Sequence, residues 1–409
     1  MKCRHCSTIL NDVFIDLRSS PPSNSYISQD ALSSSEKWYP LRVLFCQSCW
    51  LVQTEDFVAE DEMFSDDYAY FSSFSSSFLK HAEKYVEKVV ERFGLHGNSH
   101  VVEVASNDGY LLQYFVKKAI PCLGIEPTLS TVIAAREKGI EVLNEFFGES
   151  SALKLVAQNQ RADLIVANNV LAHVPDINDF VKGFSVLLNP QGVATFEFPH
   201  LVNLVEKNQF DTMYHEHYSY LSLTSVKAIF ESNNLSIFDV EELPTHGGSL
   251  RVYAQRSDSG EQPVGSNVVD LLVREEGIGL KTVDYYAGFK EKAEEIKLSL
   301  LEFLIAAKRE GKQVVGYGAA AKGNTMINYS GVGPDLITYV VDKNPAKQNM
   351  YLPGSRIPIE NLAYLRENVP DYIIILPWNL SSEIKNELVD LTDLGTTLVR
   401  FVPVFEVVI

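Results

Sequence analysis

The densest group of side chains able to do acid–base chemistry lies between residues 213 and 220. It contains His215, Glu216 and His217, and a tyrosine, Tyr214, directly before them. A histidine titrates near neutral pH, an adjacent carboxylate can fix its tautomer, and a tyrosine hydroxyl can donate to a developing oxyanion. The spacing lacks the HExxH pattern of a metalloenzyme. We therefore interpret this segment as a general acid–base site, with metal binding and plain aromatic packing as the alternatives.

Four cysteines form two CxxC pairs in the N-terminal part of the chain. They are Cys3, Cys6, Cys46 and Cys49. Each pair offers two thiolates from one tight turn, and four thiolates make the closed tetrahedral site that is typical of structural zinc. We predict no chemistry there, because no position is left for water. A redox dithiol and iron held by the same four thiolates are the alternatives.

Residues 101–112 have the pattern of a strand, a tight loop and a helix. Valines around Glu103 predict the strand, and a run of small and turn-forming residues predicts the loop. This is the first half of a βαβ unit, in which backbone N–H groups at the start of a helix face a ligand. The loop consists of Ala105, Ser106, Asn107, Asp108 and Gly109.

Polar residues also follow the next two predicted strands. Glu126 ends a strand about 20 residues after the loop, where an acid suits hydrogen bonding to a ribose. Asn168, Asn169 and His173 follow a third strand. A doubly wound sheet binds its ligand outside the carboxyl ends of its strands, so we expect these side chains at one ligand site.

A second strand, glycine turn and helix are predicted at residues 314–325. This loop could bind NAD, with Asp342 as the ribose acid, or it could cradle the diphosphate of a nucleotide sugar, because backbone N–H groups and a lysine both suit phosphate. A unit that binds nothing is the third alternative. The candidate residues are Gly316, Tyr317, Gly318, Ala319, Lys322, Gly323 and Asn324.

An earlier glycine turn enters a predicted strand and leaves room for a ligand against its backbone. Its candidate residues are His246, Gly247, Gly248, Ser249 and Arg251.

The alternation of strands and helices predicts an α/β protein with more than one core. The chain has 409 residues, of which 46% are apolar, enough for two or three domains. We predict a zinc-ribbon module at residues 1–65, a doubly wound sheet at 66–245 and a second Rossmann-like α/β domain at 246–409.

The net charge of −18 disfavours non-specific binding to nucleic acid or to an anionic membrane. No apolar run approaches the roughly 20 residues needed to span a bilayer, and the N-terminus lacks the apolar core of a signal peptide. We expect a soluble, cytoplasmic protein with no nucleic-acid or membrane partner.

The order of the motifs resembles the class I S-adenosylmethionine (SAM) methyltransferases. Over nearly the whole chain it is similar to the SAM-dependent C-methyltransferases of nucleotide-linked deoxysugars, from antibiotic and surface-polysaccharide pathways. The motifs are CxxC twice, VEVASNDG, GIEP, NNVLAHVPD, FEFPH, YHEHYSYLS, HGGSLRVY and GYGAAAKGNT. Where the family's first loop usually has glycines, this chain has Ala105, Asn107 and Gly109. We expect the loop to avoid positive φ at Ala105, since only glycine adopts such values freely.

The resemblance implies SAM and structural zinc as cofactors and a nucleotide-linked keto-deoxysugar as substrate, with TDP favoured over GDP. Glu103, the loop that follows it, Glu126, Asn168 and Asn169 would then surround SAM. The C-terminal glycine loop and the turn at His246 would hold the sugar nucleotide, which puts the active site between the domains.

The resemblance further implies that His217 is the base, with Glu216 and Tyr214 beside it. A ketone at C4 acidifies the C3–H bond of the sugar, so His217 would remove that proton, while Tyr214 or His173 would hold the enolate oxygen. A tyrosine at 68 or 70 would line the same pocket, and the sequence does not decide between Tyr68 and Tyr70. The alternatives are SAM-dependent methylation of oxygen, nitrogen or a macromolecule, and an NAD-dependent oxidoreductase.

Overall fold

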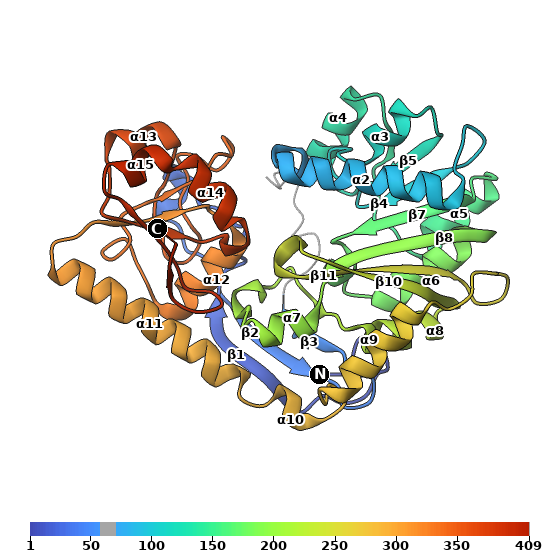
Figure 1. Cartoon of the computed structure of the whole chain (residues 1–409), viewed down its shortest axis with the longest axis horizontal. Coiled ribbons are helices and arrows are strands. Elements are labelled where there is room, and N and C mark those ends of the chain that lie inside the picture. Colours follow the sequence, from blue (N-terminus) through green and yellow to red (C-terminus); the bar gives the residue numbers. More distant parts are fainter. Residues whose placement is uncertain (58–70, 409) are drawn as a thin grey trace.

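Three β-sheets organise the chain, and the computed structural model describes residues 1–57 and 71–408. The first sheet lies at the base of the molecule, and the second and third sheets form the cores of two separate lobes above it (Figure 1). Among the residues that the structure describes, no helix has both the length and the apolar character needed to span a bilayer.

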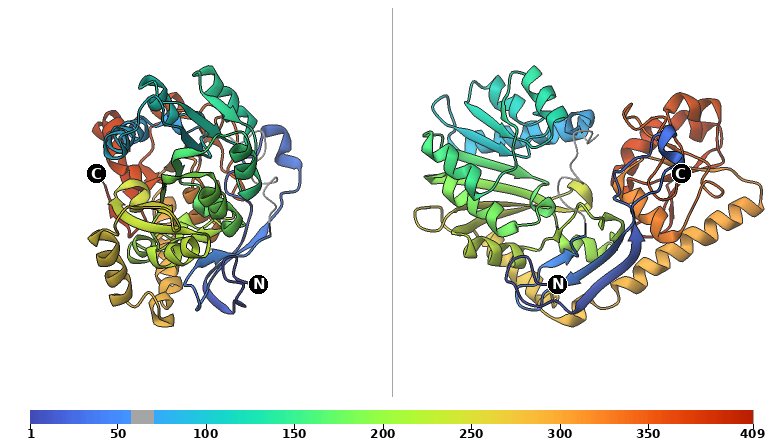
Figure 2. Two further views of the ribbon diagram at one scale, coloured as in Figure 1. Left: turned by 90° about the vertical axis from the view of Figure 1, so that its right-hand side faces the viewer. Right: turned by 180° about the vertical axis from the view of Figure 1, so that it is seen from behind.

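The sheet at the base is antiparallel and combines the N-terminal segment with a strand from residues 213–220, which we call the acid–base segment after the role predicted for it. Its order is β1 (Asp12–Ser20), β2 (Tyr39–Phe45), β3 (Val52–Thr54) and β9 (Ser219–Tyr220). β1, drawn in blue, runs from the base toward the C-terminal lobe (Figure 2). The first sheet is therefore completed by residues directly after His217.

The second sheet has seven strands and the order β10-β11-β8-β7-β4-β5-β6. The strands from β8 to β6 are parallel, β11 is antiparallel to β8, and β10 is antiparallel to β11. Their bounds are β4 (Val101–Val104), β5 (Cys122–Ile125), β6 (Glu141–Leu143), β7 (Ala162–Asn168), β8 (Leu188–Pro199), β10 (Leu235–Leu243) and β11 (Ser249–Arg256).

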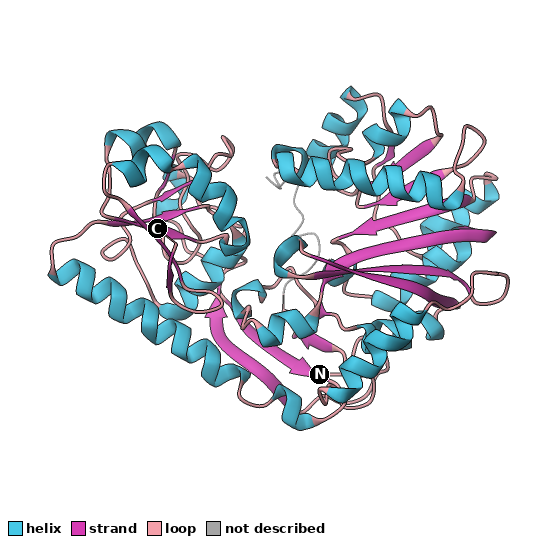
Figure 3. Ribbon diagram, viewed as in Figure 1, coloured by secondary structure: helices cyan, strands magenta, loops and turns pink. Residues whose placement is uncertain are grey.

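Helices cover both faces of this sheet (Figure 3). Because successive side chains of a strand point to opposite faces, Leu164 and Val166 pack on one side and Ile165 and Ala167 on the other. The first face holds α2 (Ser76–Phe93), α3 (Leu112–Lys117) and α4 (Leu129–Glu137), and the second holds α5 (Glu149–Ala157), α6 (Ile177–Leu187), α8 (Leu223–Ser232) and α9 (Ser266–Gly277).

The division expected at residues 245 and 246 does not coincide with the separation of the sheets. β11 pairs with β8 from Ser249 to Gln255, so the strand after the His246 turn completes the second sheet instead of starting the third. The sequence pattern shows a strand there but not its partner, because pairing depends on contacts far apart in the chain.

The third sheet has the order β14-β13-β12-β15-β16-β17 and is parallel except for β17. Its strands are β12 (Val314–Tyr317), β13 (Val340–Val341), β14 (Ile359–Glu360), β15 (Tyr372–Ile375), β16 (Thr397–Arg400) and β17 (Glu406–Val407). Its helices include α11 (Phe289–Arg309), α12 (Ala321–Ser330), α13 (Leu362–Glu367), α14 (Ser381–Glu387) and α15 (Val389–Asp393). The strands β12 to β16 follow the doubly wound order, with the switch point between β12 and β15.

The base sheet is packed against the C-terminal lobe through aromatic side chains. The rings of Phe14 and Phe289 stack with centroids 4.5 Å apart, and those of Phe45 and Tyr286 stack at 4.3 Å. Tyr286 ends α10 (Val283–Tyr286), from which α11 runs along the outside of the C-terminal lobe (Figure 1). These contacts bury large apolar area and fix the C-terminal lobe on the N-terminal segment.

Candidate active site

A cavity of about 630 Å³ lies where the loops of the two doubly wound sheets face each other. The second sheet contributes the loops after β4 and β7, which flank its switch point. The third sheet contributes the loops after β12 and β15, which flank the corresponding point there. Open α/β sheets bind ligands at these switch points, and here both points open into one cavity.

The loop after β4 enters this cavity with two non-glycine residues in the left-handed region. Ala105 has φ 56° and Asn107 has φ 50°. The expectation that the loop avoids positive φ at Ala105 is therefore wrong. The loop is held by a hydrogen bond of 2.8 Å from the Ala105 N–H to the Ile125 carbonyl, and this tertiary contact offsets part of the roughly 1–2 kcal/mol cost of the conformation. Gly109 has φ 74° as well, and a Cβ there would also lie 2.3 Å from the end of the Ile140 side chain, so both the conformation and the space favour glycine.

Glu126 and two asparagines present hydrogen-bond acceptors at the same end of the cavity. The Glu126 carboxylate is buried, which raises its pKa, and it accepts the N–H groups of Asn107 and Thr128, both at 2.9 Å. Asn168 and Asn169 also line the cavity, and within the described chain their Oδ1 atoms have no hydrogen-bond donor. The hydroxyl groups and the ammonium group of SAM are donors that fit these acceptors.

Four of the predicted cofactor residues do not line the cavity: Glu103, in β4, and three residues of the loop itself, Ser106, Asp108 and Gly109. Asp108 forms an ion pair of 3.2 Å with Lys138, and burial raises the pKa of Glu103 well above its usual value. Their contacts support the shape of the loop.

His217 lies in the wall of the cavity and its hydrogen bonds define its tautomer. Nδ1 is 2.8 Å from the Thr212 carbonyl, so Nδ1 carries the proton and donates it. Nε2 is then the basic nitrogen, and it accepts the hydroxyl of Tyr214 at 2.8 Å. Burial, followed by the nearby His173, lowers the pKa of His217 well below its usual value, so the imidazole is neutral and able to take a proton at neutral pH.

Glu216 and His215, which precede His217 in sequence, and His173, from the loop after β7, divide between the cavity and the core. Glu216 lines the cavity, and burial raises its pKa to about 7 although Asn24 donates to Oε2 at 2.6 Å. His173 lies with its ring centroid 4.6 Å from that of His217, and burial lowers its pKa to about 4. His215 contacts the Pro40 carbonyl at 3.1 Å and is not among the cavity residues.

The turn at His246 brings one of its predicted residues to the cavity. His246 lines the wall, and burial lowers its pKa to about 4. Gly247, Gly248, Ser249 and Arg251 shape the turn and the strand behind it.

A buried cluster of charged side chains lies next to the His246 turn and includes Arg251. Arg251 pairs with Glu197 at 2.6 Å, and His81 lies 2.9 Å from the same carboxylate. Burial raises the pKa of Glu197, but His81 and Arg251 outweigh that effect and lower it to about 2. Thr245, at the start of the turn, donates to Glu197 at 2.9 Å, so this cluster fixes the turn that carries His246.

Most residues predicted for the C-terminal glycine loop and its ribose acid do not line the cavity. They are Gly316, Tyr317, Gly318, Ala319, Gly323, Asn324 and Asp342. The Asp342 carboxylate accepts the Ala319 N–H at 2.8 Å. The Ala319 carbonyl accepts the hydroxyl of Tyr26 at 2.6 Å. Lys322 lines the cavity, together with Ala320 and Ala321 at the start of α12.

Sequence reasoning missed several cavity residues. Asn379 follows β15, so the rule of polar residues at strand ends could have identified it. No local sequence pattern indicates the other three, because they reach the cavity only through contacts between distant segments. They are Phe78, Asn24 and Lys347. The predicted tyrosines, Tyr68 and Tyr70, lie outside the described residues.

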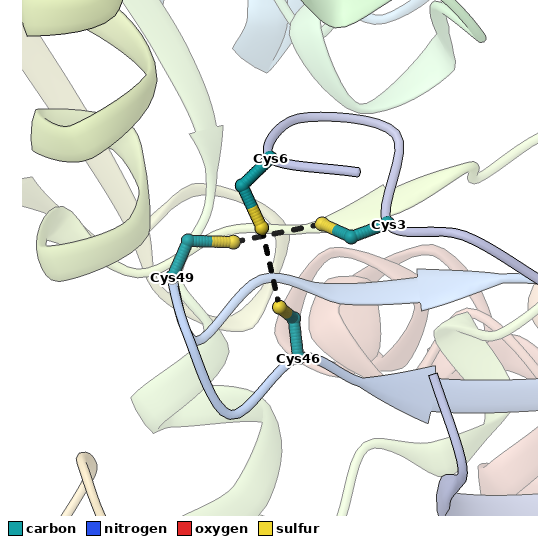
Figure 4. Close-up of side chains that lie close together, drawn as sticks. All are labelled: Cys3, Cys6, Cys46 and Cys49. Atoms are coloured by element: carbon teal, nitrogen blue, oxygen red, sulfur yellow. Dashed lines mark hydrogen bonds between the residues drawn. The ribbon is translucent and has the colours of Figure 1, made fainter. Parts of the chain in front are cut away.

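The four N-terminal cysteines converge on one point from two turns (Figure 4). The Sγ atoms of Cys3 and Cys49 are 3.6 Å apart, those of Cys6 and Cys46 are 3.5 Å apart, and all four lie within 4.8 Å of one another. Tetrahedral zinc with bonds of about 2.3 Å separates its sulfur ligands by about 3.8 Å, so the group fits zinc. Because the four sulfurs close the site, it is structural.

Comparisons with known proteins agree with this arrangement. Residues 3–64 match a zinc binding domain, residues 78–240 a methyltransferase domain, and residues 244–403 a C-methyltransferase C-terminal domain. The C-methyltransferase NovU of Streptomyces niveus is 33% identical over 386 residues, which cover 94% of this chain and 91% of that protein.

Two solved methyltransferases are similar over part of the chain. Magnesium protoporphyrin IX methyltransferase of Synechocystis has 15% identity and a TM-score of 0.36, covering 44% of this chain and 83% of its own. A SAM-dependent methyltransferase of Clostridium acetobutylicum has 13% identity and a TM-score of 0.36, covering 45% of this chain and 92% of its own. From the whole-length relative and the three matched domains, the chain belongs to the family of SAM-dependent C-methyltransferases with an N-terminal zinc-binding domain.

Proposed function

We propose that this C-methyltransferase methylates C3 of a nucleotide-diphospho-4-keto-6-deoxysugar, in a pathway to an antibiotic or a surface polysaccharide. The observation that supports it most is the cavity shared by both lobes. A neutral histidine base, His217, lies in that cavity between the loops expected to bind SAM and the start of α12. A sugar carbon is nucleophilic only when a neighbouring ketone acidifies its C–H bond, and such a base is what that activation requires.

When bound, SAM supplies an electrophilic methyl group. In our proposal Glu126 accepts the ribose hydroxyls and the amide oxygens of Asn168 and Asn169 accept the ammonium group. These side chains hold the methyl donor at the second sheet, so that its methyl group and the sugar carbon meet at near-attack distance, roughly 3–3.5 Å.

His217 Nε2 takes the C3 proton in this proposal. In the absence of substrate this nitrogen accepts the Tyr214 hydroxyl, so the sugar must displace that hydrogen bond before the base can act. The released hydroxyl can then donate to the carbonyl oxygen at C4, and His173, in ring contact with His217, is the second neutral donor. Glu216 lies beside them, and its hydrogen bond from Asn24 fixes its orientation.

The C-terminal lobe would bind the sugar nucleotide. Ala320 and Ala321 place the first turn of α12 in the cavity wall, and backbone N–H groups at a helix start favour the anionic oxygens of a diphosphate. Lys347 lines the same wall and adds positive charge. Because the chain as a whole is acidic, binding of an anionic substrate depends on the N–H groups at the start of α12 and on Lys347.

Replacing Glu126 tests the proposed SAM site. We expect Glu126→Ala to raise the Kd for SAM by roughly 10- to 100-fold, because a hydrogen bond to a charged group contributes about 1.5–3 kcal/mol and the loop amide of Asn107 also loses its acceptor. Isothermal titration calorimetry with SAM measures this. Glu91→Ala on the exposed face of α2 is the matched control, and equal affinity of both variants would remove Glu126 from the site.

The proposed activity is tested by mass spectrometry of sugar nucleotides incubated with the protein and SAM. We expect TDP-4-keto-6-deoxysugars to gain the mass of one methylene group, with the new methyl on carbon by NMR. The GDP counterparts are tested in parallel. Methylation of an oxygen or nitrogen of the sugar nucleotide would contradict the proposal.

A further inference from the structure

Two ammonium groups line the cavity among the residues that the structure describes, and their surroundings differ. Nζ of Lys347 donates to the Ala319 carbonyl at 2.8 Å and lies 4.0 Å from the Asp342 carboxylate. Its charge is therefore partly balanced within the C-terminal lobe, close to the glycine loop. Lys322 is the second cation.

Lys322 is held in place without a carboxylate partner among the described ion pairs. Its Nζ donates to Asn379 Oδ1 at 2.9 Å and lies 4.5 Å from the centroid of the Trp378 ring. Asp211 attracts the ammonium through space but is not ion-paired with it among the described residues: its Oδ2 accepts the Trp378 indole N–H at 2.7 Å, and its Oδ1 has no hydrogen-bond donor there. An ammonium removed from water and left without a paired anion is costly, so such a group points to an anion that comes with the ligand.

The contacts of Lys322 connect its ammonium to the part of the cavity wall that contains His217, the proposed base. The Trp378 indole that the Lys322 ammonium contacts donates to Asp211, and the carbonyl of the next residue, Thr212, accepts from His217 Nδ1. This chain of contacts links the ammonium to the His217 ring, and its charge lowers the pKa of His217 after the larger effects of burial and His173. Lys347 instead acts on Tyr26 and Glu216. The two lysines thus differ in their contacts: Lys322 is held by Asn379 and Trp378, and Lys347 by the Ala319 carbonyl of the glycine loop.

A proton leaving C3 places a full negative charge on the substrate. The C–H electron pair moves into the C3–C4 bond, the carbonyl electrons move onto O4, and the proton goes to His217 Nε2. The donors Tyr214 and His173 are neutral, and a cation in a desolvated site stabilises such an oxyanion far more than it would in water.

We propose that the Lys322 ammonium binds the C4 carbonyl oxygen of the sugar and stabilises the enolate oxygen. The proposal rests on the proposed function. It assigns Lys322 a catalytic role in place of the diphosphate contact expected from the sequence, and it leaves the diphosphate to the start of α12 and Lys347.

Lys322→Met separates these two roles. With a TDP-4-keto-6-deoxysugar in deuterated water and no SAM, we expect deuterium entry at C3 under saturating substrate to fall at least about 100-fold. The Kd for TDP alone should stay within about threefold of that of the unmodified protein. A Kd for TDP raised tenfold or more with normal exchange at saturation would make Lys322 a phosphate ligand and overturn the proposal, as would exchange unchanged in every respect.

Two controls test whether the Lys322 variant is folded and whether loss of any lysine charge would have the same effect. SAM affinity reports that the variant is folded, and if Lys322→Met fails that test, Lys322→Gln replaces it with the same expected outcome. Lys312→Met removes an exposed charge that is ion-paired with Asp371 and should not change exchange. Absence of exchange in the unmodified protein would contradict the proposed function itself, whereas equal exchange in both proteins contradicts only the role of Lys322.

Discussion

His217→Ala should lower turnover, and deuterium exchange at C3, by at least about 100-fold, the loss typical of a missing general base. The variant should still bind SAM normally, because the acceptors assigned to SAM belong to the second sheet and do not contact the imidazole. The reason for the large effect is geometric. His217 Nδ1 donates its proton to the Thr212 carbonyl, so Nε2 is the basic nitrogen in the cavity wall. Steady-state kinetics and calorimetry measure the two quantities separately.

A matched control for this variant is His96→Ala, which removes an exposed histidine from the surface. It should retain the turnover of the unmodified protein. Near-normal turnover of His217→Ala would exclude the imidazole as the base, and Tyr214 and Glu216 would then be the remaining groups of the segment to test.

Cys46→Ser should reduce bound zinc to near zero and lower the free energy of unfolding by several kcal/mol. Structural zinc contributes about 10–16 kcal/mol to the folding of isolated zinc-finger peptides. We expect a smaller loss here because the first sheet also packs on α10 and α11 through Phe14 and Phe45. Metal analysis and denaturant unfolding give the two values.

The fifth cysteine provides the control for this experiment. Cys122 begins β5 and lies outside the four-sulfur group, so Cys122→Ser should keep its zinc. If Cys46→Ser bound as much zinc as Cys122→Ser, the assignment of four thiolate ligands would be contradicted.

The zinc site and both doubly wound sheets could be predicted from the sequence because their signals are local. A CxxC turn brings two ligands together within four residues, and a polar residue at a strand end reaches the ligand edge of a sheet whichever neighbour that strand has. The strand-end rule also predicts Glu126 and Asn168 as ligand residues, and the glycine turn before a helix predicts Lys322; all three line the cavity.

Features that depend on distant segments could not be predicted. Asn24 reaches the cavity because the segment after β1 packs on the C-terminal lobe, where the Ser23 carbonyl accepts the Asn324 side-chain N–H at 2.6 Å, and the Asn24 side chain donates to Glu216. The same limit explains β11, whose strand pattern was clear but whose partner, β8, was not. At Ala105 the residue type favoured negative φ, and the contact with β5 prevailed over that preference.

The most direct test of enolisation followed by carbon methylation is deuterium exchange of the sugar nucleotide by the full-length protein. The protein is incubated with a TDP-4-keto-6-deoxysugar in deuterated water, first without SAM and then with it. Our account predicts that deuterium enters C3 when SAM is absent, and that adding SAM gives a product with one methyl group on that carbon. A protein that binds SAM and methylates the sugar nucleotide on oxygen, with no exchange at C3, would contradict it.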